Sequence, residues 1–276
     1  MSILDFLYHT IPGRMGLKIL TNPAIAKLCG CFLDSRASKF LIDPFVRANA
    51  IDLSQFYSND FRSFNDCFAR KIRKGMRPFD PDPSSFVAPC DGLLSVCEIK
   101  NDTVIPVKQT AYNLTRLLHS KKLAKRYEGG YCLVYRLCVN HYHRYSYIDS
   151  GVKGPNHFIN GKLHTVQPIA LENVPVFTEN CREFTVMNTD NFGKVVQMEV
   201  GAMLVGKIKN YHGRHVIKRG EEKGCFLYGG STIIILTEPG RVVIDENILR
   251  ASARGEETRV LMGEYVGKGV KKNRPF

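Results

Sequence analysis

The chain has 276 residues, which is enough for one large domain or for a small domain with an added segment. Its apolar content of 44% and charged content of 24% are ordinary for a globular protein and exclude a chain that is disordered throughout. The net charge of +13 favours a polyanionic partner, either nucleic acid or an anionic membrane surface.

The cysteine and hydropathy patterns indicate a cytosolic protein. Nine scattered cysteines without a Cys-x-x-Cys pair are typical of reduced thiols in a cytosolic protein. No basic segment followed by an apolar core marks a signal peptide, and no apolar run approaches the ~20 residues that span a bilayer. We therefore expect no membrane-spanning helix, while a peripheral membrane role stays open.

Residues 1–78 are predicted to form a helical, membrane-associating N-terminal segment. Apolar residues recur at helical spacing, and Pro12 and Pro23 divide the first part into short helices. These helices are compatible with an amphipathic membrane anchor and equally with a cap on the hydrophobic core. Residues 36–78 also look helical, with a capped start at Ser63 and a basic run, 69–74, expected on a solvated helix face.

A proline-rich connection, residues 77–83, marks the boundary to a β-rich catalytic domain, residues 79–276. One basic helix is expected over residues 112–127. The predicted fold class is α+β, with N-terminal helices followed by a β-rich body of mostly antiparallel short strands. The clearest strands are expected at residues 86–88, 93–99, 131–139, 185–188, 195–200 and 203–208.

The stretch from 221 to 236 contains two short apolar runs, 225–228 and 232–236, on either side of Gly229-Gly230-Ser231. By itself this pattern is typical of a hairpin turned by two glycines. A chemical interpretation is also open. The Ser231 hydroxyl can reach the carbonyl of the preceding residue, and Gly230 has no side chain to shield that carbonyl.

Two further segments carry candidate catalytic groups. Asp91 lies in a Pro-x-Asp-Gly turn, where it can serve the turn alone or orient an imidazole. The segment 140–147 contains His141 and His143, which an extended strand would place on one face. A catalytic histidine is favoured over a metal site, because no third ligand set lies nearby. The alternative is an aromatic strand with incidental histidines.

Taken together, the segments from about residue 64 to residue 264 resemble phosphatidylserine decarboxylases. Each motif is weak alone, and the ordered set carries the resemblance. The motifs are Pro89-Cys90-Asp91-Gly92, Tyr142-His143-Arg144, Gly229-Gly230-Ser231-Thr232 and the segments 64–70, 77–80, 163–170, 179–183, 198–202 and 223–226.

The resemblance implies a decarboxylase that makes a pyruvoyl cofactor from its own chain. Ser231 would attack the Gly230 carbonyl, and the chain would split into a β chain, 1–230, and an α chain, 231–276, with a pyruvoyl group in place of Ser231. That group would form a Schiff base with the headgroup amine of phosphatidylserine and accept the electrons released with carbon dioxide, so that phosphatidylethanolamine is produced. No metal is expected.

By motif position, the resemblance implies that Asp91 is the charge-relay carboxylate of self-cleavage and that His143 acts in decarboxylation. The family usually carries a second histidine three residues later as the base for the serine, and here that position is Ser146. Either His143 or His141 would then take the role, or self-processing would be slow, or the protein would not mature. We hypothesise that His143 serves both steps, which an unprocessed His143→Ala protein would support. The alternative is an uncleaved lipid-binding pseudoenzyme.

The expected partners are an anionic phospholipid membrane containing phosphatidylserine and the α and β chains of one precursor, with a homodimer left open. The basic balance suits such a membrane, since each nearby Lys or Arg contributes about 1 kcal/mol of attraction. The expected location is peripheral, on the cytoplasmic face of the cell membrane. A decarboxylase of a soluble amino acid and a nucleic-acid binder are rival classes; the Tyr-His-Arg context and the absence of a binding motif disfavour them.

Overall fold

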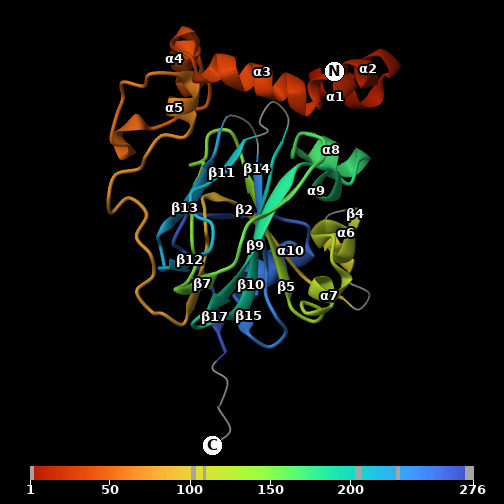
Figure 1. Ribbon diagram of the computed structural model, residues 1–276, viewed down its shortest axis with the longest axis vertical. Helices are drawn as coiled ribbons and strands as arrows, with labels where there is room; N and C mark the ends of the chain where they lie inside the picture. The colour runs from red at the N-terminus through yellow and green to blue at the C-terminus, as the bar shows by residue number, and fades with distance from the viewer. Residues whose placement is uncertain (1–2, 101–103, 108–109, 203–206, 228–230, 271–276) are drawn as a thin grey trace, which may run out of the picture.

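The computed structural model describes residues 3–100, 104–107, 110–202, 207–227 and 231–270. N-terminal helices lie across one end of a β-rich body (Figure 1), and every pair of named strands is antiparallel, which confirms the α+β class. The helices are α1 (Ile3–His9), α2 (Ile11–Leu20), α3 (Pro23–Asp34), α4 (Ile42–Ala48), α5 (Phe64–Phe68), α6 (Leu114–Leu118), α7 (Lys121–Lys125), α8 (Pro168–Asn173), α9 (Val176–Glu179) and α10 (Glu246–Ala253), with 3-10 helices η1 (Arg36–Leu41) and η2 (Leu53–Gln55).

A nine-stranded sheet forms the centre of the body. Its order is β12 (His215–Ile217), β7 (Gly151–Lys153), β9 (Arg182–Thr189), β10 (Gly193–Val200), β14 (Ser231–Leu236), β5 (Tyr131–Leu137), β2 (Gly92–Glu98) and β16 (Thr258–Val260), with β8 (His157–Ile159) paired to β9. Three smaller sheets are β1 (Ser85–Val87), β17 (Tyr265–Gly269) and β15 (Val242–Ile244); β11 (Ile208–Asn210), β13 (Glu222–Phe226) and β6 (Arg144–Ser146); and β3 (Val104–Val107) with β4 (Thr110–Asn113).

The strands expected at 86–88, 93–99, 131–139, 185–188 and 195–200 coincide with β1, β2, β5, β9 and β10, which confirms those predictions. Of the expected strand 203–208, residues 203–206 lie outside the described part of the chain. The first turns of α2 and α3 contain Pro12 and Pro23, as predicted. Proline is accommodated there because the first amides of a helix have no intrahelical acceptor.

Strand β14 is central, and both of its faces are buried. Ile233 and Ile235 belong to one hydrophobic cluster, while Ile234 and Leu236 belong to another on the opposite face. Successive side chains of a strand point to opposite faces, so a strand covered on both sides needs a continuous apolar run. This explains why Ile-Ile-Ile-Leu shows no alternation.

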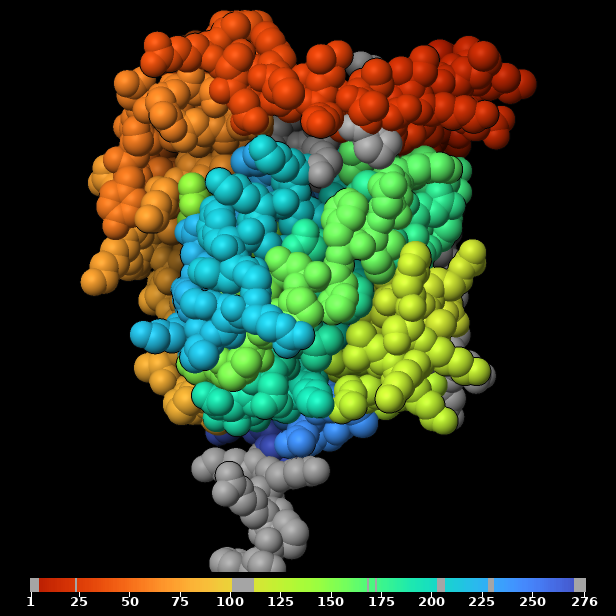
Figure 2. Space-filling view, viewed as in Figure 1, coloured from red at the N-terminus to blue at the C-terminus, as the bar shows by residue number. Residues whose placement is uncertain are grey.

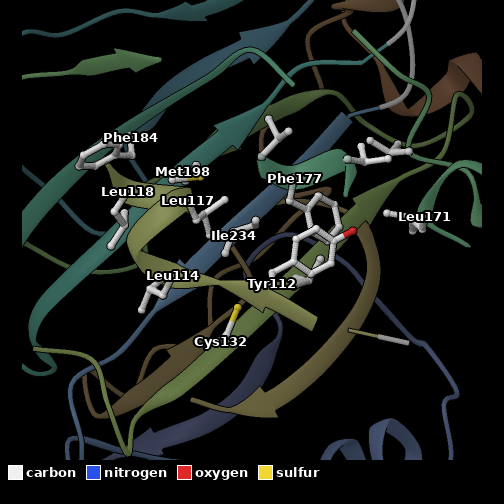
Figure 3. Packing of buried hydrophobic residues seen from close by; sticks show 14 of the residues in the cluster. Tyr112, Leu114, Leu117, Leu118, Cys132, Leu171, Phe177, Phe184, Met198 and Ile234 are labelled. Carbon is white, nitrogen blue, oxygen red and sulfur yellow. The ribbon is translucent and has the colours of Figure 1, made fainter. Parts of the chain in front are cut away.

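Short helices cover one face of the central sheet. Figure 3 shows Leu117 and Leu118 of α6 and Phe177 of α9 in the same cluster as Met198 of β10 and Ile234 of β14. Burial of a side chain of this size stabilises the fold by about 1.5–3 kcal/mol relative to exposure, so this cluster fixes the helices on the sheet.

The prediction of a single helix over residues 112–127 is wrong. Residues 110–113 form β4, and two short helices follow, because His119 adopts the left-handed conformation at φ +50° and ends α6. The Ser120 hydroxyl then accepts a hydrogen bond from the Leu123 amide at 3.2 Å and begins α7. Serine is a favourable N-cap because its oxygen satisfies an amide that the helix leaves unpaired.

The basic run 69–74 is not on a solvated helix face. The Ser63 cap forms as predicted, but α5 ends at Phe68. Arg70 is buried, and its guanidinium donates to the carbonyl oxygens of Asn140 and His141 at 3.0 and 3.1 Å. A buried guanidinium needs such acceptors to replace lost water, and these bonds join the N-terminal segment to the histidine segment.

The hairpin interpretation of residues 221–236 is also wrong. Strand β13 pairs with β6 and β11, whereas β14 pairs with β5 and β10. The two strands therefore lie in different sheets and are not neighbours across a turn. Gly229 and Gly230, named in that interpretation, lie outside the described residues.

The N-terminal helices have two different faces. Leu7, Tyr8 and Leu17 are buried in the main hydrophobic cluster. On the other side, α2 presents Ile11, Met15 and Ile19, which are 73%, 67% and 61% exposed. Figure 2 shows this segment as a ridge along one end of the molecule. None of the helices within the described residues has the length and apolar content that crossing a membrane requires.

Candidate active site

Asp91 lies in the turn between β1 and β2, as predicted, and it is buried. Its two carboxylate oxygens accept hydrogen bonds from Nε and Nη2 of Arg77 at 2.8 and 2.6 Å. One of the same oxygens, Oδ1, also accepts from the Met262 amide at 2.9 Å. A bidentate pair of this kind fixes the carboxylate in position.

A small pocket of about 160 Å³ contains the Asp91 carboxylate. Arg70, Arg77 and Arg259 line it, and so does His141. Asp91 and His141 thus share one cavity, although the Asp91 carboxylate makes no hydrogen bond with an imidazole among the residues described here. The three guanidinium groups make the pocket a cationic environment, suited to a carboxylate or another anion.

His143 is completely buried, and its hydrogen bond determines where its proton lies. Nδ1 lies 2.9 Å from the carbonyl oxygen of His141. A carbonyl oxygen can only accept, so Nδ1 carries the hydrogen and Nε2 of the neutral ring has a free lone pair. Burial, helped by the charge of Arg70, lowers the pKa of His143 well below its ordinary value. His143 is therefore neutral near pH 7, with Nε2 able to accept a proton.

His141 has the opposite tautomer. The Cys138 amide donates to Nδ1 of His141 at 3.1 Å, so the hydrogen of the neutral ring is on Nε2. Burial lowers the pKa of His141, and Asp91 partly offsets this effect. The free nitrogen of His141 is thus a donor, whereas that of His143 is an acceptor. Only His143 is arranged as a base.

The segment 140–147 is not one extended strand, so the predicted sharing of a face by His141 and His143 does not hold. Only residues 144–146 are strand, in β6. The neighbours of His143 line different cavities: Tyr142 lines the Asp91 pocket and Arg144 lines a second pocket. The ring of Phe68 packs on His143 with centroids 4.0 Å apart. His143 itself is 0% exposed and lines neither of these two pockets.

Ser146 stands where the resemblance leads one to look for a histidine. Its hydroxyl is buried and donates to Sδ of Met262 at 3.2 Å. The Met262 amide in turn donates to Asp91, so this position lies one residue away from the carboxylate. Met262 and Arg77 thus supply the hydrogen bonds that the Asp91 carboxylate accepts.

Ser231 is the first residue of β14 and is completely buried. It pairs with Leu137 at the end of β5, the strand that leads into the histidine segment. On the other side, the Phe226 amide of β13 donates to the His143 carbonyl at 2.9 Å. The strands on both sides of 228–230 therefore anchor next to that segment. Gly230, the other half of the predicted cleavage site, lies outside the described residues.

Several buried polar atoms have no hydrogen-bond partner among the described residues, and Nε2 of His143, Oγ of Ser231, Oγ1 of Thr232 and Nε of Arg70 are among them. A buried polar atom without a partner costs about 1–3 kcal/mol and is uncommon in stable proteins. A reaction or a ligand that uses the atom is one explanation for such an exception. Ser231 carries a hydroxyl and His143 an imidazole, which are groups of the kind that acyl transfer uses.

The second pocket is larger, about 500 Å³, and lies between the N-terminal segment and the sheet of β11, β13 and β6. Leu227, the last described residue before 231, is part of its wall. Two aspartates also line it, Asp34 and Asp66, but cationic side chains are in the majority. These are Arg36, Arg62, Arg144, Lys207 and Lys209.

The sequence analysis missed a fully buried ion pair beside this pocket. Glu199 of β10 accepts a hydrogen bond from Lys223 of β13 at 2.7 Å, and both side chains are 0% exposed. It also missed the bond between Arg77 and Asp91. The sequence did contain a pointer to these residues. The segments that contain Arg77, Glu199 and Lys223 are among the motifs that carry the family resemblance, namely 77–80, 198–202 and 223–226.

The chain is similar in sequence to proteins of one known family. The sequence model of the family described as phosphatidylserine decarboxylase matches residues 64–268. Phosphatidylserine decarboxylase proenzyme 2 of Clostridium acetobutylicum is 44% identical over 96% of this chain and 91% of its own length. The phosphatidylserine decarboxylase proenzyme of Ruminiclostridium cellulolyticum is 40% identical over 98% and 92%.

A third relative, the phosphatidylserine decarboxylase proenzyme of Clostridium beijerinckii, is 38% identical over 97% of this chain and 92% of its own length. These matches extend over the N-terminal helices as well as the body. Together with the family match across most of the chain, they establish that this protein belongs to the phosphatidylserine decarboxylase family.

Proposed function

We propose that the chain is a self-processing precursor that becomes a pyruvoyl-dependent phosphatidylserine decarboxylase. The observation that carries the proposal is that two atoms in a member of this family, Oγ of Ser231 and Nε2 of His143, are buried and lack a hydrogen-bond partner among the described residues. The name proenzyme, printed for the relatives, agrees with a precursor that is processed. Asp91, His143 and Ser231 are the proposed catalytic residues.

Self-cleavage starts at Ser231. Its hydroxyl gives a proton to Nε2 of His143 while Oγ attacks the Gly230 carbonyl carbon. The Ser231 nitrogen takes up a proton and leaves, which converts the amide to an ester. Loss of the Ser231 α-proton expels the Gly230 carboxylate and splits the chain, and water then replaces the nitrogen as ammonia. The pyruvoyl group that remains supplies an electron sink for decarboxylation.

His143 also suits the second reaction. It takes and returns protons at Nε2, because its Nδ1 hydrogen stays bonded to the His141 carbonyl. Asp91 acts with Arg77 as a fixed charge that organises the pocket of His141. The substrate is an anionic lipid, and the pocket lined by five cationic side chains, between the helices and β11, suits its headgroup.

Intact-mass measurement of the purified protein tests the proposal. We expect two chains, residues 1–230 and 231–276, with the N-terminus of the second chain blocked. The Ser231→Ala variant should remain one chain, because alanine has no nucleophile. A wild-type protein that stays as one chain under all conditions would contradict the proposal and favour an uncleaved lipid-binding pseudoenzyme.

We also propose that residues 1–78 form a membrane-associating segment, and 79–276 the catalytic domain, on the cytoplasmic face of the cell membrane. The exposed residues Ile11, Met15 and Ile19 recur every four positions and form one apolar stripe on α2. Such a stripe can enter a lipid interface while the basic residues of the chain attract anionic headgroups. The assembly state, including a homodimer, is a separate question.

Replacing these three residues together with asparagine should weaken binding to phosphatidylserine-containing vesicles at least about tenfold, since each inserted side chain contributes over 1 kcal/mol. Vesicle cosedimentation measures this. The matched control changes the exposed valines 152, 216 and 243, on β7, β12 and β15, to threonine. Deletion of residues 1–33 is a poorer test, because it also removes Leu7, Tyr8 and Leu17 from the core. Equal loss in both variants would contradict a membrane role for α2.

A further inference from the structure

Outside both pockets, among the residues that the structure describes, one group of three side chains has the composition and spacing of a metal site. It consists of His212, His215 and Glu221. One ligand atom from each lies within 4.8 Å of the others. The group lies where the edge strand β12 of the nine-stranded sheet meets the turn that leads into β13. We propose that these three residues bind a divalent transition-metal ion, with zinc as the best match.

The distances fit a metal with tetrahedral coordination. Nε2 of His212 and Nε2 of His215 lie 3.7 and 2.9 Å from the same Glu221 oxygen, Oε1. Zinc bonds to nitrogen and oxygen of 2.0–2.2 Å place tetrahedral ligand atoms about 3.4 Å apart. The two observed distances fall on either side of this value, so small side-chain movements bring all three ligands to one ion.

The two histidine rings lie against each other beside Glu221. The two imidazoles are stacked, with centroids 4.1 Å apart and an interplanar angle of 7°. Both Nε2 atoms lie near Oε1 of Glu221, but each lone pair lies in the plane of its own ring, so one imidazole must rotate before both can bind a single ion. The set of two imidazoles and one carboxylate is typical of zinc sites that keep a fourth position for water, and it does not suit magnesium or calcium, which prefer oxygen ligands.

Surrounding groups hold each ligand in place before any ion binds. The Tyr147 hydroxyl lies 3.1 Å from Nδ1 of His212, which leaves Nε2 as the coordinating nitrogen. The Tyr147 amide also donates to the Glu221 carbonyl at 2.9 Å, so one buried tyrosine positions two of the three ligands. Outer contacts of this type orient metal-binding histidines and raise affinity.

The other contacts complete this frame. Glu221 uses its second oxygen, Oε2, to accept from the Lys218 amide at 3.0 Å, which leaves Oε1 directed at the histidines. His215 is fixed by strand pairing with Lys153 of β7. The buried Lys153 ammonium donates to the carbonyls of His212 and Gly213 at 3.1 and 2.8 Å, which fixes the turn.

An ion at this site would join two sheets. His215 belongs to the nine-stranded sheet, while Glu221 immediately precedes β13 of the three-stranded sheet. The proposed site is therefore structural, and it does not depend on the proposed decarboxylase activity.

Zinc titration of the full, metal-free chain tests the proposal by calorimetry and thermal unfolding. We expect one tightly bound ion and a rise in Tm of about 5 °C in excess zinc. His212→Asn, His215→Asn and Glu221→Gln should each weaken zinc binding at least about tenfold and remove the rise in Tm. Tyr147→Phe, which removes an outer contact, should weaken binding by about tenfold. A large excess of magnesium should not compete.

Two control variants remove other surface ligands. His119→Asn replaces an exposed histidine at a left-handed position that asparagine tolerates, and Cys31→Ser replaces an exposed thiol. Both should bind zinc as the wild type does. The Tm of each metal-free variant shows whether it is folded. Zinc binding that survives in all three ligand variants, or no zinc binding by the wild type, would overturn the assignment.

Discussion

Replacing His143 with asparagine is expected to slow self-cleavage by about 10²- to 10⁴-fold, the usual contribution of a positioned general base. The asparagine amide nitrogen occupies nearly the place of Nδ1 and can still donate to the His141 carbonyl, which accepts at 2.9 Å in the wild type. The variant therefore keeps the local hydrogen bond and loses only the Nε2 lone pair. The fraction of intact chain over time, followed by mass spectrometry, measures the effect.

The matched variant is His141→Asn. Its side-chain oxygen can still accept from the Cys138 amide, as Nδ1 does at 3.1 Å. Because Nε2 of His141 carries the hydrogen, its removal takes away a donor and no base, and cleavage should continue within about tenfold of the wild-type rate. Normal cleavage by His143→Asn together with an uncleaved His141→Asn protein would assign the base to His141 instead.

Lys223→Met is expected to lower the free energy of unfolding by about 3–5 kcal/mol, the cost of removing one partner of a buried ion pair. Glu199 has no exposed surface, and Oε2 then keeps only the Asn210 amide, at 3.1 Å. Burial already raises the pKa of Glu199. Protonating a carboxyl at pH 7 costs about 3.7 kcal/mol, from 1.36 kcal/mol for each pH unit above its ordinary pKa of about 4.3. Denaturant titration of both proteins measures the difference.

The pH dependence of this loss has a definite sign. A carboxyl whose folded pKa is raised stabilises the folded state fully below its unfolded pKa, and this contribution is lost as the pH rises from there through its folded pKa. The difference between the wild type and Lys223→Met should thus be largest near pH 7 and smaller near pH 5. The double variant Glu199→Gln/Lys223→Met leaves no charge at the site of this ion pair and should recover most of the stability that Lys223→Met loses. If Lys223→Met lowered the free energy of unfolding by less than about 1 kcal/mol, a stabilising role for the Glu199–Lys223 ion pair would be contradicted.

This ion pair also bears on processing. Lys223 and Phe226 belong to the same strand, β13, and the Phe226 amide holds the His143 carbonyl. A strand that loses its buried anchor should hold His143 less firmly. Strand β13, which precedes the proposed cleavage site, therefore supports the proposed base His143 through Phe226 and is itself anchored by Lys223.

Local patterns in the sequence predicted the elements whose signals are local. The Ser63 cap, the first-turn prolines of α2 and α3 and the apolar run of β14 each depend on a few neighbouring residues, and each formed as expected. The helix over 112–127 failed because His119 takes a left-handed conformation that no hydrophobic period reveals. The basic run failed because Arg70 finds carbonyl acceptors 70 positions away.

The sequence by itself determined the fold class, the family motifs and the candidates Asp91, His143 and Ser231, because their order along the chain carries that information. Only the tertiary structure decided which strands pair, and thus that β13 and β14 form no hairpin. It also decided which histidine has a free lone pair, because tautomers depend on distant or backbone partners. Spacing along a chain cannot report a proton's position, whereas a carbonyl at 2.9 Å can.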